Sequence, residues 1–163
     1  MTNKIKEVAE LVAERSSLTD DQLLAELAAM EPLADESDPC WSEDDYWNTA
    51  NLYLALADIA TTRKLRPAIA LLLERACYGD PNEIMRGLRH NLEAIVNPEW
   101  SYLTDVCLEA AKSSRLGTRL WAISELAVLA DPRAKPIFEE AVKNGPEELR
   151  WRAENGLERL AEK

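Results

Sequence analysis

The sequence predicts an all-α fold, an α-solenoid of stacked antiparallel helix pairs with about eight helices. Ala, Leu, Glu and Arg are strong helix formers and dominate the 163 residues, whereas glycine occurs only five times. Apolar residues recur at helical spacing, and short turns with proline, glycine or asparagine separate the helical runs. Because 47% of the residues are hydrophobic, one continuous core is possible, and we expect residues 1–163 to form a single domain.

The first two expected helices cover residues 3–15 and 20–30. The first has an apolar face at helical spacing. The second follows a capping box, in which the Thr19 hydroxyl accepts a backbone N–H and Gln22 reaches back to the N-cap.

A long irregular stretch follows over residues 31–41, where two prolines and repeated acids prevent a continuous helix. Ser42 then provides an N-cap, and three acids follow at the positive end of the helix dipole. This helix runs to about Ile59 and is apolar on most sides, which indicates a position in the interior.

The remaining sequence alternates helical runs with turns such as Gly79-Asp80-Pro81 and Asn144-Gly145-Pro146. The helices are expected over residues 67–77, 84–95, 99–112, 118–130, 134–143 and 147–161.

Alternate helices of this part align with one another. At a constant offset of 31, Arg119, Ala122, Leu126 and Leu129 match Arg150, Ala153, Leu157 and Leu160. Going back from Leu126, an offset of 34 gives Leu92 and a further offset of 36 gives Leu56. Repeats of this length with two helices each are typical of an α-solenoid, and they are most regular over residues 50–163.

Two of these segments resemble HEAT repeats, and are closest to the short variety named after phycobilisome lyases. They are Leu-Ala-Asp-Pro-Arg-Ala-Lys-Pro at 129–136 and Glu-Leu-Arg-Trp-Arg-Ala at 148–153. The resemblance is good over 118–163, fair over 50–112 and weak for the first two helices. It implies the architecture but no particular activity, because such stacks serve as scaffolds, inhibitors, lyases and nucleic-acid enzymes.

Charge is distributed unevenly along the chain. Residues 1–60 hold fourteen acidic and three basic residues, a balance of −11, whereas residues 61–163 hold sixteen of each. The acidic part would repel nucleic acids and anionic membranes and attract a basic protein, so we expect no nucleic acid and no membrane as partner. A surface that only keeps the protein soluble is the alternative explanation.

An acidic segment set with aromatic residues is the first candidate for contact with a partner. Trp and Tyr are favoured anchors of protein interfaces, and the acids around them would attract surfaces rich in Lys and Arg. Alternatively, Trp41 and Trp47 cap the hydrophobic core while the acids solvate a loop. The candidate residues are Asp35, Glu36, Asp38, Trp41, Glu43, Asp44, Asp45, Tyr46 and Trp47.

The second candidate surface comes from aligning the second helix of each pair, which lines the concave face in HEAT-like stacks. Trp121 aligns with Asn51, Gly87 and Arg152, and Glu125 aligns with Ala55, Asn91 and Gly156. Most of these side chains are not aliphatic, which predicts an exposed ridge. Its candidate contact residues are Asn51, Asn91, Trp121 and Glu125.

Signatures of catalysis and metal binding are lacking in the sequence. A single histidine, His90, supports no histidine cluster or triad, and the motifs for phosphate cradles and common hydrolases are absent. Three widely spaced cysteines give neither a disulfide framework nor a metal clip. The acids of residues 35–45 lack the spacing of an EF-hand. We therefore expect no enzyme, no metal and no cofactor.

These observations favour a non-catalytic protein that binds another protein. Small acidic helical proteins of this type resemble bacterial immunity proteins, which neutralise a cognate toxin, often a basic nuclease. The alternative is a scaffold or maturation factor of the phycobilisome-lyase type. No apolar run approaches the about 20 residues of a membrane span, and the N-terminus lacks the apolar stretch of a signal peptide, so we expect a cytoplasmic protein.

Overall fold

The computed structural model describes residues 5–33, 42–76 and 87–162. Within these ranges all regular structure is helical and no strand occurs, which confirms the all-α class. The described ranges contain nine α-helices, one for each helical range expected from the sequence, and a short 3₁₀ turn, η2 (Pro132–Ala134). The helices are α1 (Val8–Arg15), α2 (Asp20–Ala29), α3 (Glu43–Thr62), α4 (Ala68–Arg75), α5 (Leu88–Val96), α6 (Trp100–Ala110), α7 (Leu116–Leu129), α8 (Lys135–Asn144) and α9 (Glu147–Ala161).

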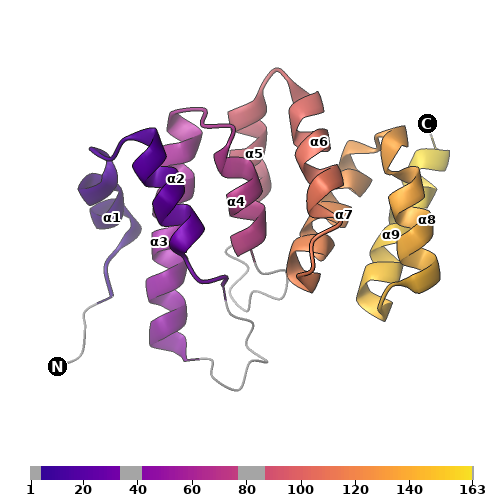
Figure 1. Ribbon diagram of the computed structural model, residues 1–163, viewed down its shortest axis with the longest axis horizontal. Coiled ribbons are helices and arrows are strands. Elements are labelled where there is room, and N and C mark those ends of the chain that lie inside the picture. Colours follow the sequence, from indigo (N-terminus) through magenta and orange to yellow (C-terminus); the bar gives the residue numbers. More distant parts are fainter. Residues whose placement is uncertain (1–4, 34–41, 77–86, 163) are drawn as a thin grey trace.

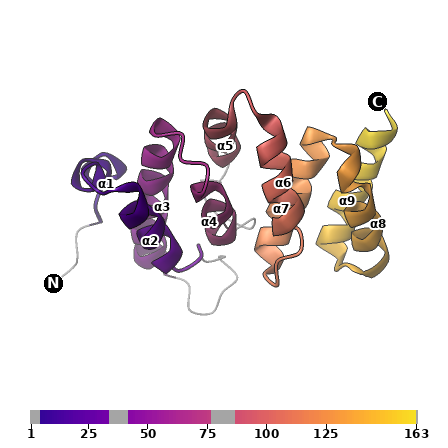
Figure 2. The same ribbon diagram turned by 45° about the horizontal axis from the view of Figure 1, so that its top comes forward.

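Most of the described helices that alternate in the sequence lie next to one another in space (Figure 1). In one row, α2 contacts α4 and α4 contacts α6; in the other, α1 contacts α3, α3 contacts α5, and α7 contacts α9. The helices α3, α5, α7 and α9 all run in one direction, and α2, α4, α6 and α8 run in the opposite direction (Figures 1 and 2). Each short turn therefore reverses the chain and returns it to the other row.

The starts of α2 and α3 follow from local chemistry, as the sequence predicts. The backbone N–H of Thr19 donates to Gln22 Oε1 at 2.9 Å, and the N–H of Gln22 donates to Thr19 Oγ1 at 3.3 Å, which confirms the capping box. The Ser42 hydroxyl accepts the Asp45 N–H at 3.3 Å and caps α3. The first helix is shorter than predicted and begins at Val8, where Glu7 and Glu10 form a capping box of their own.

Helix α3 joins the N-terminal helices to the rest of the chain. The buried hydroxyl of Tyr53 donates to the carbonyl of Leu72 in α4 at 3.0 Å. Directly after the last residue of α3, the Arg63 guanidinium donates to the carbonyls of Leu18 and Ser16 at 2.8 and 2.9 Å. These bonds fix the turn between α1 and α2 against the end of α3, and nine residues of α3 are buried, as expected of an interior helix.

The core follows the repeated positions of the sequence. Leu56, Leu92 and Leu126, which the offsets of 34 and 36 relate, are all fully buried, in α3, α5 and α7 respectively. Helix α7 is enclosed on several sides, because α4, α6 and α9 all pack against it. Its buried residues are Thr118, Leu120, Trp121, Ala122, Ile123, Glu125, Leu126 and Ala127.

The last pair of helices is held by close packing of an aromatic ring on a glycine. A Cβ atom built on Gly156 in α9 would lie 2.6 Å from Cζ of Phe138 in α8, so a larger residue there displaces the ring. Phe138 is fully buried, and Gly156 is buried as well. The alignment of Gly156 with an exposed ridge is therefore wrong, because this face of α9 packs on α8.

We predict that Gly156→Ala lowers the free energy of unfolding by about 1 kcal/mol. Overpacking against Phe138 costs about 1–3 kcal/mol, and the better helix propensity of alanine offsets only about 1 kcal/mol of this. The matched control is Gly117→Ala in α7, where the nearest atom to the new Cβ would be the Ala76 carbonyl oxygen at 3.7 Å. Gly117→Ala should raise the free energy of unfolding by about 0.5–1 kcal/mol. Urea unfolding of both variants measures the difference, and a gain in stability at both positions would contradict the packing argument.

Candidate functional site

The start of α3 presents three carboxylates to solvent. Glu43, Asp44 and Asp45 form the first turn of the helix and are all exposed. Their charges lie at the positive end of the helix dipole, which stabilises the helix locally. Asp45 also accepts a hydrogen bond from the Ser42 hydroxyl at 2.6 Å, whereas Glu43 and Asp44 form no ion pair within the described part of the chain. All three charges of this turn thus lack a cationic partner among the described residues.

The aromatic residues beside these acids belong to the core. The rings of Tyr46 and Trp47 meet edge to face with centroids 5.4 Å apart. Tyr46 is only 2% exposed, and the half-buried Trp47 packs against the core cluster. Tyr46 is therefore not available as the exposed anchor that the sequence predicts, because α3 turns it inward. Trp47 covers the core, as the alternative explanation of the sequence predicts, and part of its side chain stays accessible.

Four other predicted contact residues, Asp35, Glu36, Asp38 and Trp41, lie outside the described residues. The described part of the first candidate surface is therefore the start of α3 and the residues around it.

The acids of the N-terminal part outnumber its basic side chains, and each described basic side chain pairs with a glutamate. Lys6 pairs with Glu14 at 2.6 Å, and Arg15 pairs with Glu26 at 2.8 Å. These are the basic residues among the described positions before residue 60. The exposed carboxylates of this part that form no ion pair within the described ranges are Glu7, Glu10, Asp21, Glu31, Glu43, Asp44, Asp45 and Asp58.

Asn51 has a structural role. Its side chain is 9% exposed, and Nδ2 donates to the backbone carbonyl of Lys6 at 3.0 Å. This bond fixes the segment before α1 against the middle of α3. Asn51 is thus covered by the N-terminal segment and is not part of an exposed ridge as predicted.

The predicted ridge is also wrong at α7. Trp121 is 7% and Glu125 is 4% exposed, so both are buried. The exposed residues of α7 are Leu116, at 36%, and Val128, at 46%. In α5, Asn91 is half-buried whereas its neighbour His90 is exposed. The aligned positions therefore do not form one exposed ridge, because packing turns those of α7 toward neighbouring helices.

Burial of Glu125 creates the one strongly perturbed carboxyl among the described residues. Burial raises the pKa of Glu125 to about 7; the Arg89 guanidinium opposes this rise and the Glu93 carboxylate adds to it. Arg89 Nη1 lies 3.1 Å from Glu125 Oε2, a distance typical of an ion pair, although its geometry is not that of a hydrogen bond. Arg89 Nε donates to Glu93 Oε1 at 2.7 Å. The arginine of α5 thus connects α5 to α7.

This cluster offers little for chemistry. A carboxyl with a pKa near 7 suits general acid–base catalysis, but Glu125 is almost inaccessible to solvent. Burial and the nearby Glu125 raise the pKa of the fully buried Cys107 thiol well above its ordinary value, so the thiol stays protonated and a poor nucleophile. Across residues 5–33, 42–76 and 87–162, no group of three His, Cys, Asp or Glu side chains is arranged to hold a metal ion.

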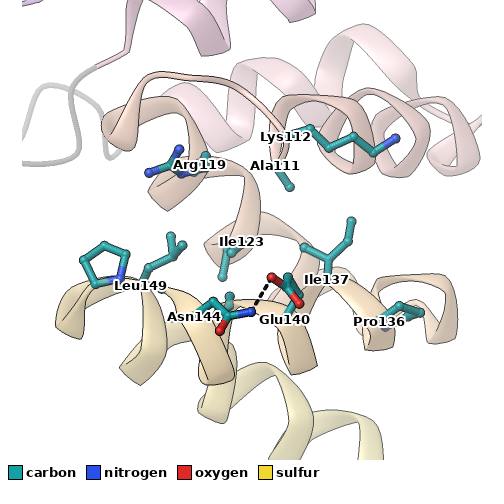
Figure 3. A pocket seen from close by; sticks show the side chains of 12 residues that line it. Ala111, Lys112, Arg119, Ile123, Pro136, Ile137, Glu140, Asn144 and Leu149 are labelled. Carbon is teal, nitrogen blue, oxygen red and sulfur yellow. Dashed lines mark hydrogen bonds between the residues drawn. The ribbon is translucent and has the colours of Figure 1, made fainter.

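An apolar groove lies between the last two helix pairs, and the sequence analysis did not identify it. It has a volume of about 480 Å³ and runs between α6–α7 on one side and α8–α9 on the other (Figure 3). Its lining is mainly apolar and includes Ala111, Ile123, Ile137 and Leu149. No signal in the sequence distinguishes these side chains from core residues, because their helical spacing is that of any buried face.

Comparison with known proteins adds no relative: no family model, no curated protein and no solved structure matches the chain. Among the described helices, none combines the length and apolar character needed to cross a bilayer.

We predict that Glu125 makes the protein less stable as the pH rises from about 4.5 to 7. In the unfolded chain its carboxyl ionises near the ordinary value of 4.5, whereas in the folded protein it stays protonated up to about 7. The folded state therefore binds the proton more tightly, and the stability linked to it is complete below about 4.5 and lost by about 7. The shift corresponds to at most about 3 kcal/mol.

The substitution Glu125→Gln tests the predicted loss of stability with rising pH, because glutamine is neutral at every pH. The free energy of unfolding of the variant minus that of the wild type should rise by about 2–3 kcal/mol between pH 5 and pH 8 in urea titrations. Glu148→Gln, a change at an exposed position of α9, is the control and should give a nearly constant difference. A pH-independent difference for Glu125→Gln would show that Glu125 does not titrate abnormally.

Proposed function

We propose that this protein is a HEAT-like α-solenoid that binds another protein and catalyses no reaction. The common direction of α3, α5, α7 and α9 and the burial of the related residues Leu56, Leu92 and Leu126 support the repeat. Such a stack presents extended surfaces formed by several helices, which suit recognition of a protein better than of a small substrate.

The partner that fits the N-terminal part is a basic protein. The observation that carries this proposal is the group of exposed carboxylates at the start of α3, of which Glu43 and Asp44 have no cationic partner among the described residues. Lys6 and Arg15 pair with Glu14 and Glu26, and their segments contact the middle and the C-terminal end of α3, away from its first turn. The surface therefore attracts Lys- and Arg-rich partners and accelerates their encounter.

The specific role that we propose is that of an immunity protein, which neutralises a cognate basic, nuclease-like bacterial toxin from within the cytoplasm. Inhibition of this kind needs shape, charge for fast association and a few anchors, and no catalytic group. The exposed acids provide the charge, and the accessible part of Trp47, one turn from Asp44, is an aromatic side chain that can contact a partner.

Capture with the tagged protein at low and at high salt tests the proposal. The expected result is a basic nuclease-like protein that is held more tightly at low salt, and whose toxicity in bacteria is suppressed when both proteins are produced together. If only chromophore-bearing proteins are held, a scaffold or maturation role of the phycobilisome-lyase type replaces the immunity role. If toxicity persists despite binding, inhibition is excluded.

For such a partner we predict that the double substitution Glu43→Lys and Asp44→Lys slows association about tenfold or more at low ionic strength and weakens its dependence on salt. Both side chains are exposed, so the fold should be retained. The matched control is Glu154→Lys with Glu158→Lys, which makes the same change in net charge on exposed positions of α9. Stopped-flow or surface-plasmon measurements give the rates, and equal slowing in both pairs would show that net charge alone acts.

A further inference from the structure

The row of helices formed by α2, α4 and α6 is interrupted before α8. Successive helices of this row contact one another up to α6, but α6 and α8 share at most a marginal contact. Helix α8 packs on α9 instead, and α9 packs extensively on α7. Because α6 and α8 do not pack closely on one another, a groove of about 480 Å³ remains between them.

The walls of this groove determine which kind of segment can bind. They are formed by side chains of helices whose backbone groups are bonded within each helix, so an extended peptide finds no free strand edge to pair with. The α8 wall runs from Pro136 to Asn144, which is about 12 Å along the helix axis. This length accommodates about two turns of another helix. Ile123, Ile137 and Leu149 supply the apolar contacts.

The basic side chains at the groove lie on one wall. Lys112 and Arg119 belong to the α6–α7 side, and Figure 3 shows them toward opposite ends of the groove. The half-buried Arg119 donates to the Ser113 carbonyl at 3.0 Å but forms no ion pair in the described structure. Lys112 pairs with Glu109 at 2.7 Å, but both side chains are largely exposed and exchange partners easily.

The opposite wall carries one negative charge, that of Glu140 on α8. One of its oxygens accepts a hydrogen bond from Asn144 Nδ2 at 2.6 Å (Figure 3). The groove thus combines an apolar floor with two cations on the α6–α7 wall and one carboxylate on the α8 wall.

We propose that this groove binds a short amphipathic helix of a partner protein, which places large apolar residues between α6 and α8 and carboxylates toward Lys112 and Arg119. Apolar residues at positions i, i+4 and i+7 would meet Ile123, Ile137 and Leu149. A second copy of this chain fits less well, because its formal charge of −11 opposes self-association. The proposal does not depend on the acidic surface at α3, which lies elsewhere on the molecule.

Selection from a library of helical peptides of about three turns tests the proposal. The peptides carry randomised residues on one face, and those that also bind the Ile137→Asp variant are removed. We expect the selected peptides to share Leu, Ile or Phe at two or three helically spaced positions and Asp or Glu beside them. Basic sequences, proline-rich extended sequences, or an empty selection would overturn the proposal.

One selected peptide is then titrated against single variants, with fluorescence anisotropy as the readout. Lys112→Glu should weaken binding about five- to tenfold at low salt, since it replaces an attraction by a repulsion. Lys135→Glu is the matched control: it is an exposed lysine of α8 that does not line the groove, and it should change the affinity less than about twofold. Equal effects of the two variants would overturn the placement of the carboxylates.

Two further measurements distinguish other occupants. Ile137→Ser, a milder change than Ile137→Asp, should also weaken peptide binding, with the dichroism spectrum unchanged. Decanoate is tested as a competitor; if it binds the groove and no helical peptide does, the ligand is a free apolar carboxylate and the proposal fails. Sedimentation of the concentrated protein tests a second copy: self-association that Ile137→Ser abolishes would assign the groove to a dimer instead.

Discussion

Helix α7 has apolar side chains around most of its circumference, and only helices packed on several sides at once can shield them from water. Helices α4, α6 and α9 provide this cover, and α9 in turn carries α8. The helix pairs are therefore not independent units, because a single pair leaves one apolar face exposed. The C-terminal pairs share one core, and α7 lies at its centre.

Enclosure of α7 also explains the unusual electrostatics in the middle of the molecule. Glu125 lies on a helix that has almost no exposed side, so its carboxyl is removed from water, and a single arginine from α5 only partly offsets the cost. The consequence is a carboxyl that stays protonated in the folded state to near neutral pH. Arg89 in turn connects α5 to α7 through Glu125, so this cluster serves the packing of helices and not a reaction.

The surface carries two features of opposite character. At the start of α3, exposed carboxylates have no cationic partner among the described residues. Between α6 and α8, an apolar groove has cations at one rim, and Arg119 there has no carboxylate partner in the described structure. The first feature arises from composition and the second from the geometry of stacking. A molecule with both can contact two regions of one partner, or two different partners.

Local physical chemistry in the sequence determined the all-α class, the positions of most helices and their caps. Hydrogen bonds four residues apart, the hydroxyls of Thr19 and Ser42, and turns with proline and glycine act over a few residues, so they can be read without knowledge of the fold. The burial of Leu56, Leu92 and Leu126 follows from the same periodicity. The acidic character of the N-terminal part is likewise a property of composition.

Only the tertiary structure decided which way each helix faces. A shift of one residue rotates a side chain by about 100°, and the apolar pattern of α7 is too broad to fix this rotation. The sequence therefore placed Trp121 and Glu125 on a ridge, whereas packing by α4, α6 and α9 buries both. The groove beside α8 has the same origin, since it forms between helices that only the fold brings together, and the fit of Phe138 on Gly156 holds α8 against α9.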